Sequence, residues 1–174
     1  MRSGRNLGGS NAGRPNGRVG DSMTGGCIPG LKGDASLRRE VKYGENARID
    51  IWLEQDPPGD GKKYYVGVKS VTMKRDLGPG KPVEFPDAVT VRGAKHLVEL
   101  ANMVRQGHRA VMMYLVQRAD SPWFAIAADI DPVYAKGLEV ARGTGVEILC
   151  YGCRLTKRDI KVTGPVPFHV PLAF

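Results

Sequence analysis

Hydrophobic and polar residues alternate with a period of two in two segments of this chain. These segments run from Arg48 to Glu54 and from Tyr64 to Thr72, and a shorter strand candidate precedes them from Leu37 to Tyr43. Such alternation is typical of β-strands that bury one face. Gly44-Glu45-Asn46 has the composition of a tight turn, and residues 55–63 are rich in Pro, Gly and Asp. We therefore expect a meander of three strands.

A helix and a buried strand are predicted next. Apolar residues recur at helical spacing from Ala94 to Val104, and Gly107 follows as a stop signal. Residues 109–117 contain a continuous apolar run, which is typical of a strand buried on both faces. Residues 77–85, in contrast, have the Gly and Pro content of a loop.

A second helix and a last strand complete the pattern. Asp131 and Pro132 are the N-cap and first-turn residues that favour a helix start. The inner face of this helix is expected to comprise Tyr134, Leu138 and Ala141. Residues 146–155 are predicted to form a strand, and the Pro-rich tail from Val162 is expected to be irregular. The order β-β-β-α-β-α-β predicts an α/β fold in which helices flank a mixed sheet.

The composition divides the chain and favours an acidic partner. The first 33 residues contain ten glycines, so residues 1–24 are expected to be flexible and residues 25–174 to form one domain. The net charge of +8 favours nucleic acid as partner, with a merely solubilising surface as the alternative. No apolar run could span a membrane and no secretory signal is present, so a cytoplasmic location is expected.

One carboxylate and one lysine lie on the second and third predicted strands. If these strands form a hairpin centred on their loop, Asp50 lies across from Lys69, with Gly67 on the same face two residues away. Such a pair is typical of metal-dependent nuclease sites, although a simple cross-strand ion pair has the same residues. The single pair Cys150 and Cys153 is expected to consist of ordinary thiols rather than zinc ligands.

Many ordered blocks of the chain resemble one known family. The blocks are Leu37–Asn46, Arg48–Asp50, Val68–Thr72, Phe85–Thr90, Arg92-Gly93, Lys95–Leu97, Arg109–Val111, Val116–Arg118, Ile130–Pro132, Tyr134-Ala135 and Gly145–Leu149. Together they are similar to the sugar fermentation stimulation protein family, SfsA, from about residue 26 to the C-terminus.

The resemblance implies a nuclease-like domain of the PD-(D/E)xK type. Its restriction-endonuclease-like core consists of a helix, three strands, a helix and a strand (αβββαβ). In the family this domain follows an OB-like DNA-binding domain, which we expect to be absent here. The family's metal-binding Asp falls on Asp50 and its catalytic Lys on Lys69. The Glu of its E-x-K motif falls on Gly67, where this chain departs from the pattern.

Phosphodiester hydrolysis at such a site needs a divalent cation, Mg²⁺ or Mn²⁺, held by carboxylates and a backbone carbonyl. Asp50 and the Val68 carbonyl are the expected ligands, with Glu40 or Glu45 as nearby acids. Lys69 would orient the attacking water or stabilise the developing charge. Because Gly67 has no carboxylate, we expect cleavage to be slower by on the order of two or more decades.

Two groups of basic residues are candidates for binding phosphates. One group lies on the strands around the site, and the other lies at the start of the first predicted helix. The residues are Arg38, Arg39, Lys42, Arg48, Arg92, Lys95 and His96. A solvated strand edge and a helix surface without a role are the respective alternatives.

Two function hypotheses follow. The first is an SfsA-like protein that binds DNA or RNA and has a magnesium-dependent nuclease fold, with cleavage weakened at Gly67. The alternative is a DNA-binding regulator of sugar-utilisation genes, of the maltose type, that has lost the chemistry. A degenerate copy with neither activity is a third, weaker option.

Overall fold

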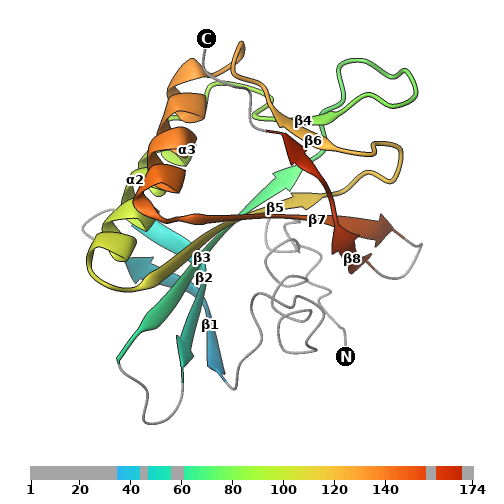
Figure 1. Ribbon diagram of the computed structural model, residues 1–174. Coiled ribbons are helices and arrows are strands. Elements are labelled where there is room, and N and C mark those ends of the chain that lie inside the picture. Colours follow the sequence, from blue (N-terminus) through green and yellow to red (C-terminus); the bar gives the residue numbers. More distant parts are fainter. Residues whose placement is uncertain (1–34, 44–46, 56–60, 156–159, 170–174) are drawn as a thin grey trace, which may run out of the picture.

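The computed structural model describes residues 35–43, 47–55, 61–155 and 160–169; before residue 56, and in residues 153–155 and 160–161, it describes the backbone alone. Within these residues the largest element is a six-stranded sheet with the order β1-β2-β3-β5-β7-β8 (Figure 1). The strands are β1 (Ala35–Tyr43), β2 (Ala47–Gln55), β3 (Lys63–Val71), β5 (Arg109–Val116), β7 (Glu147–Leu155) and β8 (Ile160–Pro165).

The sheet is mixed, as predicted. β1, β2 and β3 are antiparallel neighbours and form the expected meander, whereas β3, β5 and β7 run parallel and β8 is antiparallel to β7. Val111, Met113 and Leu115 of β5 are buried, and so are the alternate residues Met112 and Tyr114. The prediction that this strand is buried on both faces is therefore confirmed.

Helices α2 (Val91–Arg105) and α3 (Pro132–Thr144) lie side by side over one face of the sheet (Figure 1). Asp131 is the N-cap of α3 with Pro132 in the first turn, as predicted. The predicted inner face of α3 is buried, and α2 is followed by Gly107 at φ +87°. These elements confirm the α/β fold class.

A second, three-stranded sheet was not predicted. It has the order β4-β6-β9 and consists of β4 (Val83–Phe85), β6 (Phe124–Ile126) and β9 (Phe168–His169). The prediction of a loop is therefore wrong at Val83–Phe85, and the tail from Val162 forms part of β8 and then β9 instead of being irregular. Strands of two or three residues are too short to show a period, so their pairing depends on tertiary contacts.

Tyr114 of β5 connects the two sheets with α3. Its ring lies 4.7 Å from the ring of Phe124, 5.7 Å from that of Phe85 and 6.1 Å from that of Phe168, centroid to centroid. Its hydroxyl lies 2.5 Å from the hydroxyl of Tyr134 on α3. Burial raises the pKa of both tyrosines above the usual value. The hydroxyl pair therefore stays protonated in the core.

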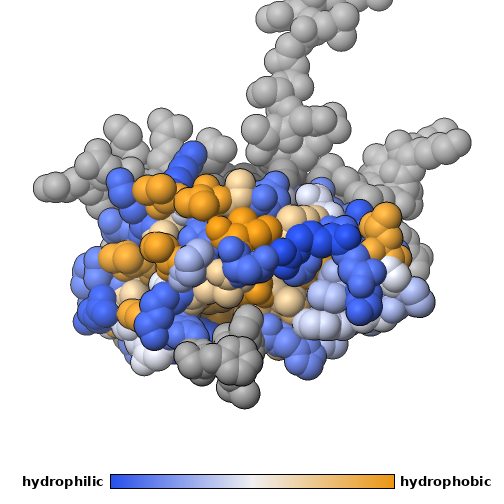
Figure 2. Space-filling view, turned by 90° about the horizontal axis from the view of Figure 1, so that it is seen from above, coloured by the Kyte–Doolittle hydropathy of each residue, from blue (hydrophilic) through white to orange (hydrophobic). Residues whose placement is uncertain are grey.

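The helix side of the molecule has a mixed surface. Seen from above, hydrophobic residues are interspersed with hydrophilic ones (Figure 2). Among the described residues, exposed valines lie on both helices, at Val91 and Val98 of α2 and at Val133 and Val140 of α3. None of the described helices combines the length and the apolar character needed to cross a bilayer.

Candidate functional site

The register of β2 and β3 places Asp50 beside Gly67. The ladder pairs Leu53 with Tyr64 and Ile51 with Val66, and extending this register by one position sets Asp50 opposite Gly67. The prediction that Asp50 lies directly across from Lys69 is therefore wrong by two residues along β3. Since a strand has a side-chain period of two, this shift leaves all three residues on the same face of the sheet.

Glu40 belongs to the same row. β1 pairs Arg39 with Ile51 and Val41 with Ile49, so Glu40 and Asp50 share the register position between these pairs. Glu40, Asp50 and Gly67 thus follow one another across β1, β2 and β3, and we call them the Gly67 row. Glu45 lies outside the described residues, whereas the register brings Glu40 to the neighbourhood that the sequence indicated.

Gly67 is covered by His96 of α2. A Cβ built on Gly67 would lie 2.8 Å from Cε1 of His96, 3.2 Å from Nε2 and 3.4 Å from Nδ1. Contacts below 3.0 Å are essentially never seen for real Cβ atoms, so the ring occupies the space in which any side chain at position 67 would begin. Only 6% of His96 is exposed, and its Nε2 is shielded from solvent.

The start of α2 determines where His96 lies. Thr90 is the N-cap, and its hydroxyl oxygen accepts a hydrogen bond from the Gly93 amide at 3.0 Å. The Thr90 amide in turn donates to Oδ2 of the buried Asp131 at 2.7 Å, while Oδ1 of Asp131 accepts from the Tyr134 amide at 2.9 Å. One carboxylate therefore anchors the first turns of both helices, and α2 carries His96 onto β3.

The basic candidates on α2 have different environments. Arg92 and Lys95 are exposed, which suits a phosphate contact, whereas His96 is buried against the sheet. On the strands, the register places Arg38, Lys42 and Arg48 on the face of the Gly67 row and Arg39 on the other face. A nucleic-acid role for any of these seven residues stays a prediction.

Lys69 is half-buried on β3 beside Tyr114 of β5 in the register. Val68 lies between Gly67 and Lys69, and its side chain is buried. Its carbonyl remains a predicted ligand for a cation. Glu40, Asp50 and Lys69 thus share one face of the sheet by register, and the His96 ring lies over position 67, where the family motif has its second carboxylate.

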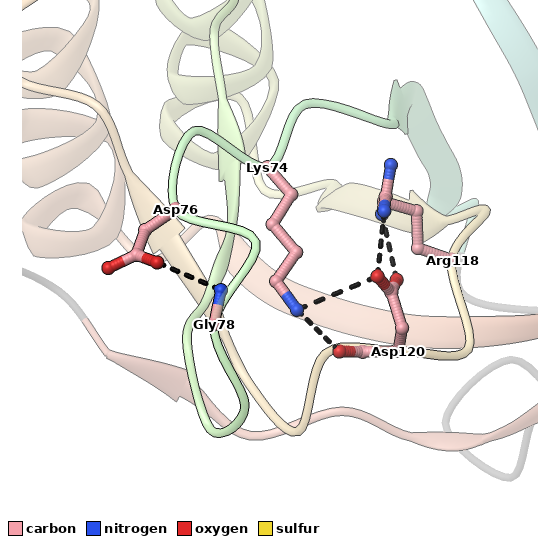
Figure 3. A network of polar contacts seen from close by, with 5 residues as sticks. All are labelled: Lys74, Asp76, Gly78, Arg118 and Asp120. Atoms are coloured by element: carbon pink, nitrogen blue, oxygen red, sulfur yellow. Dashed lines mark hydrogen bonds and ion pairs between the residues drawn. The ribbon is translucent and has the colours of Figure 1, made fainter.

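Charged residues at the carboxyl ends of β3 and β5 pair with one another. Lys74 Nζ donates to the Asp120 carbonyl at 2.6 Å and lies 3.6 Å from the Asp120 carboxylate (Figure 3). Arg118 binds the same carboxylate through two nitrogens and lowers the pKa of Asp120 to about 2. These contacts join the two loops, and the Asp120 carboxylate offsets part of the positive charge of Lys74 and Arg118.

A second group of ion pairs joins residues of the neighbouring loops. Arg75 binds the carboxylates of both Glu84 and Asp129. The Asp76 carboxylate accepts a hydrogen bond from the Gly78 amide at 2.9 Å (Figure 3) and pairs with Lys81 at 3.2 Å. Sequence reasoning missed these contacts because the partners are far apart in the chain or lie in segments without a period.

Among the residues whose side chains are described, no candidate metal centre is present. No group of three His, Cys, Asp or Glu side chains among them could hold a metal ion. Cys150 is a free thiol in the core, and burial raises its pKa to about 12. Cys150 is thus a core thiol, as one of the two predicted placements, core or surface, has it, while the side chain of Cys153 lies outside the described residues.

A family model and several curated proteins match this chain. The model described as "Sugar fermentation stimulation protein RE domain" matches residues 13–159. A sugar fermentation stimulation protein homolog of Rhodospirillum rubrum is 52% identical over 176 residues, which cover 98% of this chain and 72% of the relative. The homolog of Rhodospirillum centenum is 56% identical over 154 residues, which cover 88% of this chain and 64% of the relative.

The fold also matches a solved structure. SfsA of Pyrococcus furiosus, determined in complex with Ca²⁺, is 26% identical to this chain and gives a TM-score of 0.77. The match covers 90% of this chain and 65% of that protein. This chain therefore spans about two thirds of the length of several proteins that it matches.

Proposed function

This chain belongs to the sugar fermentation stimulation protein family, and on that premise we propose that it binds nucleic acid and has a nuclease-like site whose cleavage is weakened at Gly67. The observation that carries the proposal is the contact between His96 and Gly67. Asp50 and Lys69 are retained, but position 67 has no carboxylate and the His96 ring lies directly over it. The residues for binding are thus retained while one residue for chemistry is lost.

The acids of the row suit a hard divalent cation in part. Asp50 and Glu40 share one register position, and the Val68 carbonyl adds a third potential oxygen ligand. Oxygen ligands are those that Mg²⁺ and Ca²⁺ prefer, and the related protein of Pyrococcus furiosus was determined in complex with Ca²⁺. A bound cation would polarise a phosphate oxygen and lower the pKa of an attacking water.

The remaining residues would position the substrate and exclude water. Lys69 lies one position beyond the Val68 carbonyl, where its ammonium group would stabilise negative charge on a phosphate. Arg92 and Lys95, both exposed at the start of α2, would hold the phosphate backbone of the nucleic acid. The buried ring of His96 closes the row from the helix side.

The second candidate is a regulator that binds DNA without cleaving it. The observation that favours it is again the missing carboxylate at Gly67, since loss of one acid need not affect phosphate binding. In this case the basic residues would act on sugar-utilisation genes as a binding surface alone.

Binding and cleavage by the purified chain separate the two candidates. We expect DNA or RNA binding that weakens linearly with the logarithm of the salt concentration, together with slow cleavage that requires a divalent cation. Lys69→Met should abolish the cleavage and leave most of the binding. Lys136→Met, which changes an exposed lysine of α3, is the matched control and should alter neither.

Salt-dependent binding without cleavage under any divalent cation would support the regulator. Absence of both binding and cleavage would contradict both candidates.

A further inference from the structure

Helices α2 and α3 form one continuous surface on the side that faces away from the sheet. Both helices start at the same level, because Asp131, the N-cap of α3, accepts a hydrogen bond from the N-cap amide of α2 at 2.7 Å. Midway along, a Cβ on Gly137 of α3 would lie 3.5 Å from Cδ1 of Leu97. At the far end, a Cβ on Gly145 would lie 3.1 Å from Cγ1 of Val104. The two helices therefore run in the same direction and stay in contact along their length.

Each helix has two exposed valines on its outer side, seven residues apart. Val91 and Val98 of α2 are 66% and 56% exposed, and Val133 and Val140 of α3 are 69% and 52% exposed. Seven residues are two helical turns, so the two valines of one helix lie on one line about 10 Å apart. Because the helices start together, the four side chains form two pairs at two levels. We call this surface the α2–α3 face.

The α2–α3 face is positively charged. Its two acids, Glu99 and Glu139, are half-buried, and Glu139 pairs with Lys136 at 3.0 Å. The exposed cations on the two helices are Arg92, Lys95, Arg105, Lys136 and Arg142. A second copy of the same face would bring like charges together, which opposes self-association through it.

We propose that the α2–α3 face binds an acidic amphipathic helix of another protein. Lys95 follows Val91 by about one turn, and Lys136 follows Val133 in the same way, so each helix has a lysine between its two valines. The complementary helix has apolar side chains two turns apart for the valines, and Glu or Asp in the turn between for the lysines. This inference goes beyond the proposed function and does not depend on it.

The described part of this chain does not itself supply such a helix. Among the described residues, α2 and α3 are the only helices, and each has more basic than acidic side chains. The exposed carboxylates of Asp76, Asp120 and Asp129 lie on loops and already pair with basic side chains. Charge complementarity therefore favours a different protein over a second copy.

Fluorescence anisotropy of a designed peptide with the full chain tests the proposal. The peptide is an alanine-based helix of about 20 residues, since shorter isolated helices are marginal in water. It has leucines at the a and d positions of a heptad pattern and glutamates at the flanking e and g positions. We expect saturable binding that weakens as the salt concentration rises.

Two control peptides separate the pattern from the composition and from the charge. One has the same residues in an order without an apolar face, and the other has lysines in place of the glutamates. Each should bind at least about tenfold more weakly than the designed peptide, because each lacks one of the two complementary features.

Single substitutions locate the binding on the face. Val98→Ser and Val140→Ser should each weaken peptide binding by about tenfold, since each removes apolar contact area. Lys136→Met should weaken it several-fold and reduce its salt dependence; Lys95 is less suitable because it is also a proposed phosphate contact. Leu77→Ser changes an apolar loop residue that is 74% exposed outside the face, and it should leave binding unchanged.

A measurement on the wild type requires no variant to fold. In NMR spectra of the chain with labelled valine and leucine methyl groups, the glutamate peptide should shift the resonances of the four valines of the face. The methyl resonances of Leu77 should stay in place.

Several results would overturn the inference and leave the proposed function standing. These are equal binding of either control peptide, unchanged binding by both valine variants, and methyl shifts that avoid the face. A wild-type dimer that dissociates on Val98→Ser would assign the face to a second copy instead. Nucleic-acid binding that weakens tenfold on Val98→Ser would assign it to nucleic acid.

Discussion

Substitution of Gly67 by alanine is the most direct test of how the site is built. The change adds one methyl group at the point where β3 meets α2. That methyl would lie 2.8 Å from Cε1 of His96, whereas ordinary van der Waals contacts begin at 3.4 Å. The ring is buried and therefore cannot turn out into solvent. Either the strand or the helix must move.

We expect Gly67→Ala to lower the free energy of unfolding by about 1–3 kcal/mol, the usual cost of adding a methylene-sized group to a packed interior. This loss in the free energy of unfolding should depend on the presence of the His96 ring. A His96→Ala background removes the ring atoms that lie nearest to the added methyl group, so Gly67→Ala should cost less there. The interaction energy of the double-mutant cycle should therefore be a large part of the single penalty, because the two groups are in contact.

Urea unfolding followed by tryptophan fluorescence measures the four free energies of this cycle. Gly143→Ala is a suitable control, since a Cβ on Gly143 of α3 would meet no atom within 4 Å. It should leave stability unchanged or raise it by less than about 1 kcal/mol. The slope of free energy against urea should be the same for all variants, which would show that the unfolded state is unaffected.

Two results would refute this reasoning. One is a Gly67→Ala variant as stable as the wild type. The other is an equal penalty with and without the His96 ring, since the cost would then arise from the strand backbone and not from the contact.

The same geometry changes how the family motif should be restored. Gly67→Glu alone places a long side chain where the His96 ring lies, so we expect a destabilised protein with no gain in cleavage. The double variant Gly67→Glu with His96→Ala makes room for the carboxylate. It should increase Mg²⁺-dependent cleavage over the parent chain, and a failure to do so would argue that another residue limits the chemistry.

Three further predictions concern the framework around the site. Asp131→Ala removes the N-cap of α3 and the acceptor of the Thr90 amide, so it should lower the free energy of unfolding, measured in urea, by roughly 2–4 kcal/mol. The control variant Asp87→Ala, at an exposed position, should change this free energy little. Tyr114→Phe should lower the free energy of unfolding by about 1–3 kcal/mol because it leaves the buried Tyr134 hydroxyl without its partner. In that background, Tyr134→Phe should lower the free energy of unfolding by much less than a second such step. The carboxylate of Asp120 has a pKa lowered to about 2, mainly by its hydrogen bond with Arg118, so its stabilising effect is present above the ordinary pKa of 3.8 and is lost as the pH falls towards 2. The stability difference between wild type and Asp120→Asn should therefore shrink between pH 5 and 2 in urea unfolding, and a difference that grows on acidification would contradict this assignment.

Local patterns predicted the main elements well. The alternation in β2 and β3 and the Asp131-Pro132 start of α3 each depend on residues close together in the chain. In each case the residues that form the pattern also stabilise the element, either by burying one face of a strand or by capping a helix amide. The short strands β4, β6 and β9 contain no such signal and form only because the core brings them together.

The candidate site, too, was predicted in part from local patterns and depends in part on tertiary structure. The sequence placed Asp50, Gly67 and Lys69 on one face, because a period of two survives any even shift of register. The shift itself, which puts Gly67 beside Asp50, depends on where the loop between β2 and β3 turns. Within the described residues, Glu40 enters the row through the same pairing of strands.

The sequence alone showed that Gly67 departs from the family motif and that Asp50 and Lys69 are retained. It could not show what lies above Gly67, because His96 is 29 positions away in the numbering and on a different element. That contact requires α2 to be anchored at Thr90 and Asp131 and laid across β3. The absence of a side chain is a property of one position in the chain, whereas what fills its place depends on the packing of distant elements.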